Sequence, residues 1–168
     1  KGTLKKEKVE WKNACAVDIV LASEGYPATH SSGEEISGLE EAKKARKMAY
    51  VPYSKYKVGA ALMTKSGKII HGCNIENAAY TPCNCAERTA FFKAVSEGIY
   101  DFCKIAVVGG FEDKDADALC TPCGVCRQVM QEFCNPKEFE IVMSDGAKIK
   151  TMKLEELLPF GFGPDNLK

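Results

Sequence analysis

The sequence has no long apolar run, no excess of charge of either sign, and only two histidines. Apolar and charged residues alternate throughout, and no stretch approaches the roughly 18 uninterrupted apolar residues that a membrane span requires. Lysine plus arginine equals aspartate plus glutamate, at 23 each, so the basic stripe of a nucleic-acid binder is missing. We therefore expect neither a membrane nor a nucleic acid as a partner.

The cysteines do not form the pattern of a disulfide framework. Nine cysteines, an odd number in a domain of this size, fit reduced thiols and a metal better. The only candidate for the apolar part of a signal peptide, ACAVDIVLA from Ala14, is short and contains Asp18. Both features predict a cytoplasmic protein.

The 168 residues are enough for one hydrophobic core and few for two. Residues 10–24 show helical spacing of apolar positions, and the stretch EGYPATHSSGEE then breaks it with glycine, proline and serine. We expect an N-terminal extension over residues 1–33, joined by a loop to a single domain over residues 34–168.

Helical and strand patterns alternate along that domain. The patterns predict helices over 35–50, 84–97 and 122–134, a final helical turn at LEELLP, and strands over 56–64, 68–76, 104–110, 139–145 and 148–153. The first two strands flank Lys65-Ser66-Gly67, which indicates a hairpin. This order favours a layered α/β domain.

The cysteine pair CGVC predicts a metal site. Thr121 is a suitable N-cap and Pro122 suits the first helical position, so Cys123 and Cys126 are expected in the first turns of the third helix. Residues three apart share a helix face, so both thiolates can reach one ion.

Three kinds of site compete for these cysteines. Cys120 extends the pair toward an iron–sulfur run, but the fourth position of that run is Met130. A structural zinc could use Cys120, Cys123 and Cys126 with Cys83 or Cys85, and would leave Glu87 without a role. The third possibility combines Cys85-Ala86-Glu87 with PCGVC.

This third combination is the C-x-E…P-C-x-x-C pattern of zinc-dependent cytidine and nucleobase deaminases. With the segments PYSKYKVGAAL, GCNIENAAY, CAERTA, PCGVCRQV and LLPFGFGP, residues 35–168 resemble the small cytidine deaminases that act on free nucleosides. The resemblance implies a three-layer α/β fold with a mixed central sheet of about five strands and helices on both faces. It makes residues 34–168 the catalytic domain.

The resemblance also implies the metal chemistry. Cys85, Cys123 and Cys126 would hold one Zn²⁺ per chain and leave a position for water, while Cys83 and Cys120 would be bystanders. Glu87 would move protons as cytidine and deoxycytidine are hydrolysed to uridine, deoxyuridine and ammonia in pyrimidine salvage. Arg88 would donate to a ligand sulfur and offset the charge of three thiolates.

Substrate contacts follow from the same resemblance. Asn74 and Glu76 would bind the ribose 3′-hydroxyl, polar groups near Ala86 would read the base, and Tyr56, where the family usually has phenylalanine, would stack on the pyrimidine. The family is a homotetramer with shared active sites, in which Phe162 would reach a neighbouring subunit's pyrimidine and Tyr80 would lie in the same contact region.

Two further alternatives stay open at this point. One is a deaminase of a modified cytosine nucleoside of the antibiotic type, which would share the metal site. The other is a binding module held together by a structural four-cysteine zinc site.

Overall fold

The computed structural model describes residues 38–116 and 118–167. The expected helical segment 10–24 and the boundary of the N-terminal extension lie outside these residues. The elements are α1 Leu39–Arg46, β1 Tyr56–Thr64, β2 Ile69–Cys73, α2 Ala86–Ser96, β3 Phe102–Phe111, α3 Gly124–Phe133, β4 Glu140–Ser144, β5 Ile149–Lys153, α4 Leu154–Leu157 and a 3₁₀ helix Pro164–Leu167.

Five strands form one mixed sheet in the order β2-β1-β3-β4-β5. The expected hairpin is present, since β1 and β2 pair antiparallel and Gly67 in their turn has a positive φ of 86°. β1 also pairs antiparallel with β3, and β5 with β4. β3 and β4 are parallel, because α3 crosses between them.

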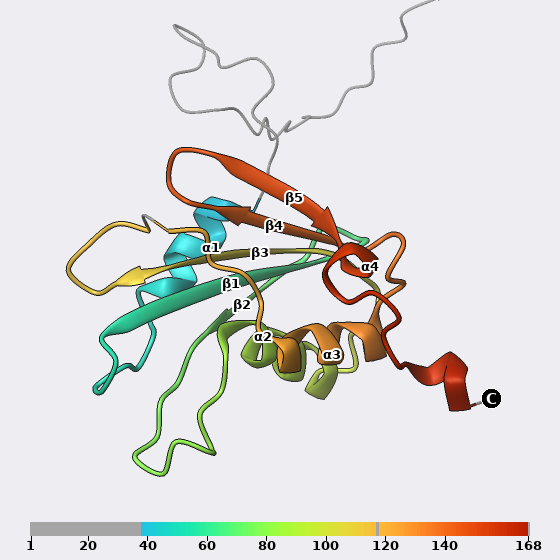
Figure 1. Cartoon of the computed structure of the whole chain (residues 1–168), viewed down its shortest axis with the longest axis horizontal. Coiled ribbons are helices and arrows are strands. Elements are labelled where there is room, and N and C mark those ends of the chain that lie inside the picture. The colour runs from blue at the N-terminus through green and yellow to red at the C-terminus, as the bar shows by residue number, and fades with distance from the viewer. Residues whose placement is uncertain (1–37, 117, 168) are drawn as a thin grey trace, which may run out of the picture. The chain divides into compact units, whose positions relative to one another are not determined.

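Helices cover both faces of this sheet (Figure 1). On one face, α1 packs through Leu39 and Ala42 against Ala61, Ala106 and Val142 of the strands. On the other face, α2 and α3 enclose the larger core around Phe91 and Met130. The three-layer α/β fold expected from the sequence is confirmed. None of the described helices combines the length and apolar character needed to cross a membrane.

Two glycines let helices approach the sheet at backbone distance. A Cβ atom on Gly72 of β2 would lie 2.2 Å from the carbonyl oxygen of Ala86 and 2.5 Å from the nitrogen of Ala90, both in α2. A Cβ atom on Gly59 of β1 would lie 2.0 Å from the carbonyl oxygen of Ala42 in α1. Only glycine fits either place, so β2 fixes the height of the first turns of α2 above the sheet.

α1 is shorter than the sequence pattern suggests. It ends at Arg46, and the chain then makes a tighter turn in which each N–H of residues 47–49 bonds three residues back. Tyr50 has left the helix: its N–H donates to Asn74, and its carbonyl accepts from Glu76. These two bonds attach the end of the first helical segment to the chain that follows β2.

The predicted start of α3 was wrong. The helix begins at Gly124, and Cys123 rather than Thr121 is its N-cap, with the Cys123 carbonyl accepting the N–H of Arg127 at 3.0 Å. Pro122 is fully buried and its carbonyl accepts a bond from Arg127 Nε at 2.8 Å, so it belongs to the extended approach to the helix. Burial of the proline ring outweighs its preference for a first helical turn.

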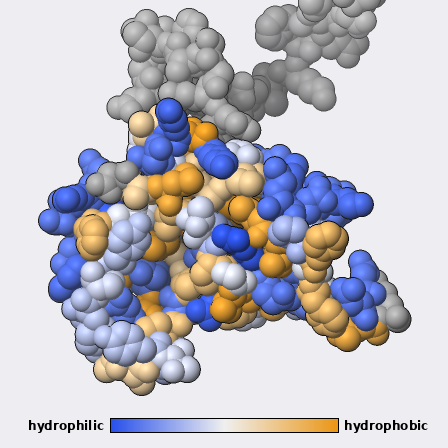
Figure 2. Space-filling model, in the orientation of Figure 1, coloured by the Kyte–Doolittle hydropathy of each residue, from blue (hydrophilic) through white to orange (hydrophobic). Residues whose placement is uncertain are grey.

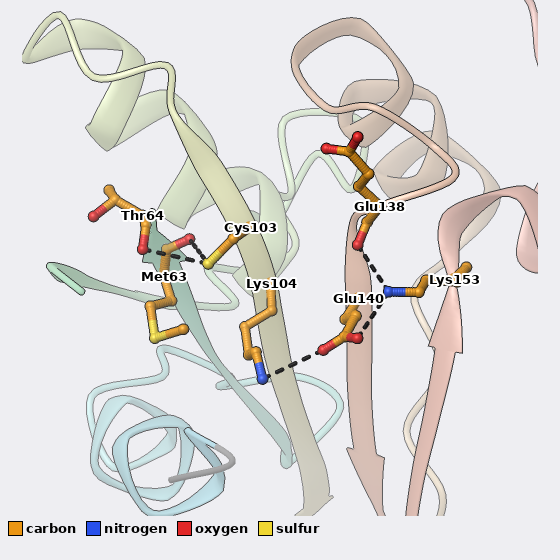
Figure 3. Close-up of polar contacts among 7 residues, drawn as sticks. All are labelled: Met63, Thr64, Cys103, Lys104, Glu138, Glu140 and Lys153. Atoms are coloured by element: carbon orange, nitrogen blue, oxygen red, sulfur yellow. Dashed lines mark hydrogen bonds and ion pairs between the residues drawn. The ribbon is translucent and has the colours of Figure 1, made fainter. Parts of the chain in front are cut away.

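Side chains close the end of the sheet where β3 pairs irregularly with β1 (Figure 3). Met63 pairs with Lys104 and Thr64 with Phe102, so Cys103 is the extra residue of a bulge. Its thiol donates to the carbonyls of Met63 and Thr64, at 3.5 and 3.3 Å. On the adjoining strands, the Glu140 carboxylate accepts from Lys104 at 3.3 Å and Lys153 at 2.7 Å.

Candidate metal centre and active site

Three thiols meet at the N-terminal ends of α2 and α3. The sulfur atoms of Cys85, Cys123 and Cys126 all lie within 4.8 Å of one another, with 3.9 Å between Cys85 and Cys123 and 3.5 Å between Cys123 and Cys126. Zinc–sulfur bonds of about 2.3 Å at tetrahedral angles put two ligand sulfurs about 3.8 Å apart. The three sulfurs therefore fit one tetrahedral ion, and three protein ligands are the number found at catalytic zinc sites.

Local helix geometry places these thiols. Cys85 is the N-cap of α2 and Cys123 is the N-cap of α3, while Cys126 lies one turn into α3 on the same side. Neither N-cap side chain bonds the helix backbone, so both sulfurs are free to face an ion. The partial positive charge at each helix N-terminus stabilises thiolate at this point.

A hydrogen bond between Cys85 and Cys126 shifts the pKa values of the two thiols in opposite directions. The hydrogen bond from Cys126, followed by the bond from Arg88, lowers the pKa of Cys85 to about 5. The pKa of Cys126 is raised, mainly by the same bond to Cys85 and then by burial. The pair therefore holds one proton between two sulfurs, and a cation that displaces this proton would satisfy both.

Arg88 supplies positive charge to the sulfurs. Its Nη2 lies 3.6 Å from Cys85 Sγ and 3.2 Å from the carbonyl oxygen of Cys83, and the guanidinium also interacts with Cys126. Its Nε is buried and has no hydrogen-bond partner among the described residues. An arginine aimed at thiol sulfurs fits a site whose ligands are thiolates.

Glu87 is a buried acid beside this cluster. It lies in the first turn of α2 and is only 4% exposed, and burial raises the pKa of its carboxyl to about 7. The negative charge of Cys85 contributes to the same rise. A carboxyl with a pKa near neutrality can both accept and donate a proton under ordinary conditions.

The acid and the thiols border a cavity of about 300 Å³. Its lining combines the ends of β1 and β2, the start of α2 and the segment before α3. The lining residues are Val58, Asn74, Ile75, Glu76, Cys83, Asn84, Cys85, Ala86, Glu87, Arg88, Cys120, Thr121 and Cys123. The cavity thus brings together Asn74, Glu76, Ala86, Glu87 and two of the three thiols.

Asn74 and Glu76 are held by the chain that leads into β1. The Asn74 amide accepts the N–H of Val58 at 2.8 Å and donates to the Tyr56 carbonyl at 2.9 Å. Oε2 of Glu76 accepts the N–H groups of Tyr53 and Ser54 at 3.0 and 3.2 Å. A hydrogen bond from the Ser54 side chain, followed by these two N–H bonds, lowers the pKa of Glu76, so this wall of the cavity carries a negative charge.

Tyr56 is not one of the residues that line the cavity. Its ring meets Phe111 edge-on at 5.3 Å, packs over Gly109 and bonds the thiol of Cys120. Burial raises the pKa of Cys120 to about 12, so Cys120 is a neutral thiol in the cavity wall. The Tyr56 hydroxyl therefore has a cysteine as its partner, which the sequence did not indicate.

Phe162 and Tyr80 also lie away from the cavity of their own chain. Phe162 is 58% exposed, and Gln128 of α3 holds its backbone carbonyl at 2.8 Å. Tyr80 is 73% exposed, has a positive φ of 60°, and touches only Tyr53 among described aromatic rings, at 6.2 Å. Cys83 bonds both backbone groups of Asn77, outside the thiol cluster.

Sequence reasoning missed several residues of this region. Val58 and Asn84 line the cavity, and Arg127 joins the carbonyl of Pro122 to that of Leu157, 2.8 Å from each. The alternation of side chains along β1 would have placed Val58 on the face of Tyr56. No sequence signal indicates the bonds of Arg127, because its carbonyl partners are distant in the chain.

Known proteins are similar to this chain over most of its length. The family profile of the cytidine and deoxycytidylate deaminase zinc-binding region matches residues 34–143. The cytidine deaminase of Sporosarcina psychrophila is 50% identical over 129 residues, which are 77% of this chain and 91% of that protein. The blasticidin-S deaminase of Bacillus cereus is 33% identical over 134 residues, 78% of this chain and 94% of that protein.

Solved structures agree with these matches. The crystal structure of cytidine deaminase from Burkholderia pseudomallei superposes with a TM-score of 0.67 at 47% identity, covering 74% of this chain and 95% of that chain. The family profile spans the thiol cluster, the buried acid and the cavity wall. The chain belongs to the cytidine and deoxycytidylate deaminase zinc-binding family.

Proposed function

We propose that the protein is a zinc-dependent cytidine deaminase that hydrolyses cytidine and deoxycytidine to uridine and deoxyuridine, with release of ammonia. The observation that carries this proposal is the buried Glu87 carboxyl beside three convergent thiols at one cavity. A purely structural zinc site would give neither the acid nor the cavity a role.

Cys85, Cys123 and Cys126 would hold one zinc ion per chain. When bound there, the ion would supply the Lewis acidity that activates water for attack on C4 of the cytosine ring. Glu87 would take a proton from that water, deliver it to N3 of the ring, and carry another to the departing amino group. Its raised pKa suits this exchange, because the carboxyl gives up and regains a proton at similar cost.

Arg88 would keep the site reactive. Three thiolates exceed the two positive charges of zinc and leave a net charge of about −1, which weakens the activation of water. The guanidinium beside Cys85 draws electron density from the sulfur and offsets part of this charge.

The cavity suits a neutral nucleoside. Glu76 and Glu87 contribute carboxyl groups to its wall, and Arg88, the only cation lining this cavity in the described chain, faces the sulfurs. A phosphate group would meet an ionised Glu76 without a cation to bind it. Asn74 and Glu76 would bind the sugar hydroxyl, polar groups near Ala86 would bind the base, and Tyr56 would support the base from behind Cys120.

The active site is proposed to be completed in a homotetramer. The segment after α4, at the lower right of Figure 2, presents a hydrophobic surface that contains Phe160 and Phe162. Phe160 is fully exposed and has a positive φ of 56°, a conformation that costs energy for a residue other than glycine. Phe162 would reach a neighbouring subunit's cavity, with Tyr80 in the same contact region.

Residues 34–168 would form this catalytic domain, with residues 1–33 as an extension to it. The family match begins at residue 34, which supports that division. A role in pyrimidine salvage in the cytoplasm belongs to the same proposal.

Incubation with cytidine tests the proposed activity, because deamination lowers the ultraviolet absorbance of the ring and releases ammonia. The Glu87→Gln variant should still bind metal and nucleoside and should lose turnover by about a hundredfold or more. A wild-type protein that contains zinc and leaves cytidine, deoxycytidine and blasticidin S unchanged would contradict the proposal. Turnover of blasticidin S alone would identify the antibiotic type of deaminase instead.

A further inference from the structure

We propose that Ser54 is a positioning residue for sugar recognition: it helps hold the Glu76 carboxylate so that one acceptor site faces the cavity for a substrate hydroxyl. This inference rests on the proposed function, because it takes the ligand of the cavity to be a nucleoside. Ser54 itself does not line the cavity and would act only through Glu76.

Three donors from one short turn meet the Glu76 carboxylate. The N–H groups of Tyr53 and Ser54 bond Oε2 at 3.0 and 3.2 Å. The Ser54 hydroxyl donates to the same carboxylate, and it makes the largest contribution to the lowered pKa of Glu76. The acid is therefore fixed by one segment of the chain and stays ionised.

The Ser54 hydroxyl is itself held in place. Its oxygen accepts the N–H of Tyr56 at 3.0 Å, which leaves the hydroxyl hydrogen to be donated to Glu76. Tyr56 is the first residue of β1, and its carbonyl accepts from Asn74. Ser54 thus links Tyr56, at the start of β1, to Glu76. Asn74 links Tyr56 to the segment after β2, which carries Glu76.

An ionised carboxylate accepts about four hydrogen bonds. The three donors of the turn leave about one acceptor site, and Glu76 borders the cavity. A neutral hydroxyl is the donor that this site suits, because a phosphate would be repelled. A pocket built to bond a hydroxyl discriminates against an analogue that lacks it, because one acceptor site then has no partner in the complex.

The experiment compares cytidine with 3′-deoxycytidine as substrates of the full chain in its zinc-bound form. For Ser54→Ala we expect kcat/KM for cytidine to fall about tenfold, mostly through KM, because a bond to a charged group is lost and the carboxylate can turn. The kcat/KM for 3′-deoxycytidine should change less than about twofold, because this substrate lacks the 3′-hydroxyl that Glu76 would bind. Ser54→Thr keeps the hydroxyl and should restore most of the preference.

Ser96→Ala is the matched control, because the Ser96 hydroxyl bonds the Lys93 carbonyl, at the far end of α2 from the cavity. It should leave both substrates unchanged. Equal losses on both substrates in Ser54→Ala, or no loss on either, would overturn the role of Ser54. If Ser54→Ala does not fold, a Ser54→Thr protein without the preference would overturn it equally. Absence of wild-type turnover on either nucleoside would instead contradict the proposed function.

Discussion

The sulfur atoms of Cys85 and Cys123 lie 3.9 Å apart, and each cysteine is the N-cap residue of its helix. The N-termini of α2 and α3 therefore meet at one point, although the two cysteines are 38 positions apart in the chain. Both positions leave the side chain outside the helix and close to its positive end. The site depends on how α2 and α3 are seated as much as on the identity of the cysteines.

Metal content should follow the three convergent thiols. Cys85→Ser, Cys123→Ser and Cys126→Ser should each lose zinc, because a hydroxyl is a much weaker ligand than a thiolate. Cys83→Ser and Cys120→Ser are matched controls from the cavity wall and should keep about one zinc per chain. Loss of metal in Cys120→Ser with retention in Cys85→Ser, measured by elemental analysis, would favour the four-cysteine site.

Gly72→Ala should displace α2 and weaken the site from a distance. The added methyl would collide with the Ala86 carbonyl and the Ala90 nitrogen, so we expect a loss of about 1–3 kcal/mol in the free energy of unfolding. Activity should fall by more than the loss of stability alone would cause, because Cys85 and Glu87 lie at the displaced start of α2. Gly124→Ala is the control for stability, as its methyl would meet no atom within 4 Å. Equal stability of the two variants in urea would contradict this account.

The pH dependence of stability should reveal Glu87 in metal-free protein. The folded pKa of about 7 lies above the ordinary value of 4.5, so between these values the folded chain binds a proton that the unfolded chain lacks. This contribution to the free energy of unfolding is full below pH 4.5 and declines by about 3 kcal/mol as pH rises through 7.

Glu87→Gln should remove that decline. The lowered pKa of Cys85 acts in the opposite direction in both proteins, so the difference between their pH profiles isolates Glu87. Denaturant unfolding at pH 5 and pH 8 measures the effect. Parallel profiles of the free energy of unfolding against pH for the two proteins would mean that burial does not raise the pKa of Glu87.

Arg88→Ala should lower activity more than stability. The guanidinium stabilises charge on Cys85, and its loss should reduce kcat by about tenfold or more while the free energy of unfolding changes modestly. Arg88→Lys keeps the positive charge but lacks the planar set of N–H donors of arginine. Its kcat should therefore lie between those of the wild type and of Arg88→Ala. An Arg88→Ala protein with full kcat and an unchanged pH–rate profile would mean that Arg88 has no role in the reaction and only a structural one.

Mixed oligomers test the sharing of active sites. Glu87→Gln protein contributes an intact Phe162, and Phe162→Ala protein contributes an intact Glu87, so each should be nearly inactive alone. If Phe162 acts on a neighbouring subunit, random co-assembly should restore about a quarter of the sites. No recovered activity in oligomers shown to contain both chains would place Phe162 on its own subunit.

The order of strand-like and helical segments predicted a layered α/β domain, and the resemblance to the small cytidine deaminases added the arrangement in three layers. Helix spacing predicted that Cys123 and Cys126 share a face, whereas the convergence of Cys85 with them was expected only from the resemblance to the deaminases. The sequence pattern failed at Thr121 and Pro122, where the buried proline ring decided where the helix begins.

Contacts set by tertiary packing could not be predicted from local patterns. The bond between Tyr56 and Cys120 joins β1 to the segment before α3. Ser54 lies in a turn, where no periodic pattern of residues indicates that its side chain bonds Glu76. The contact of Tyr56 with Cys120 depends on the register of β1 against β3 and on Gly109, over which both side chains pack, so it forms only when the sheet is assembled.

The position of β5 bears on how the protein behaves at high concentration. It is one of the two edge strands of the sheet in the described chain, so its outer backbone groups offer a template for strand addition by another molecule. Exposed Lys148 and Lys150 lie at this edge, and a second copy pairing there would bring its own lysines against them. Like-charge repulsion opposes such open-ended growth, so the lysines at this edge disfavour fibres built along the sheet.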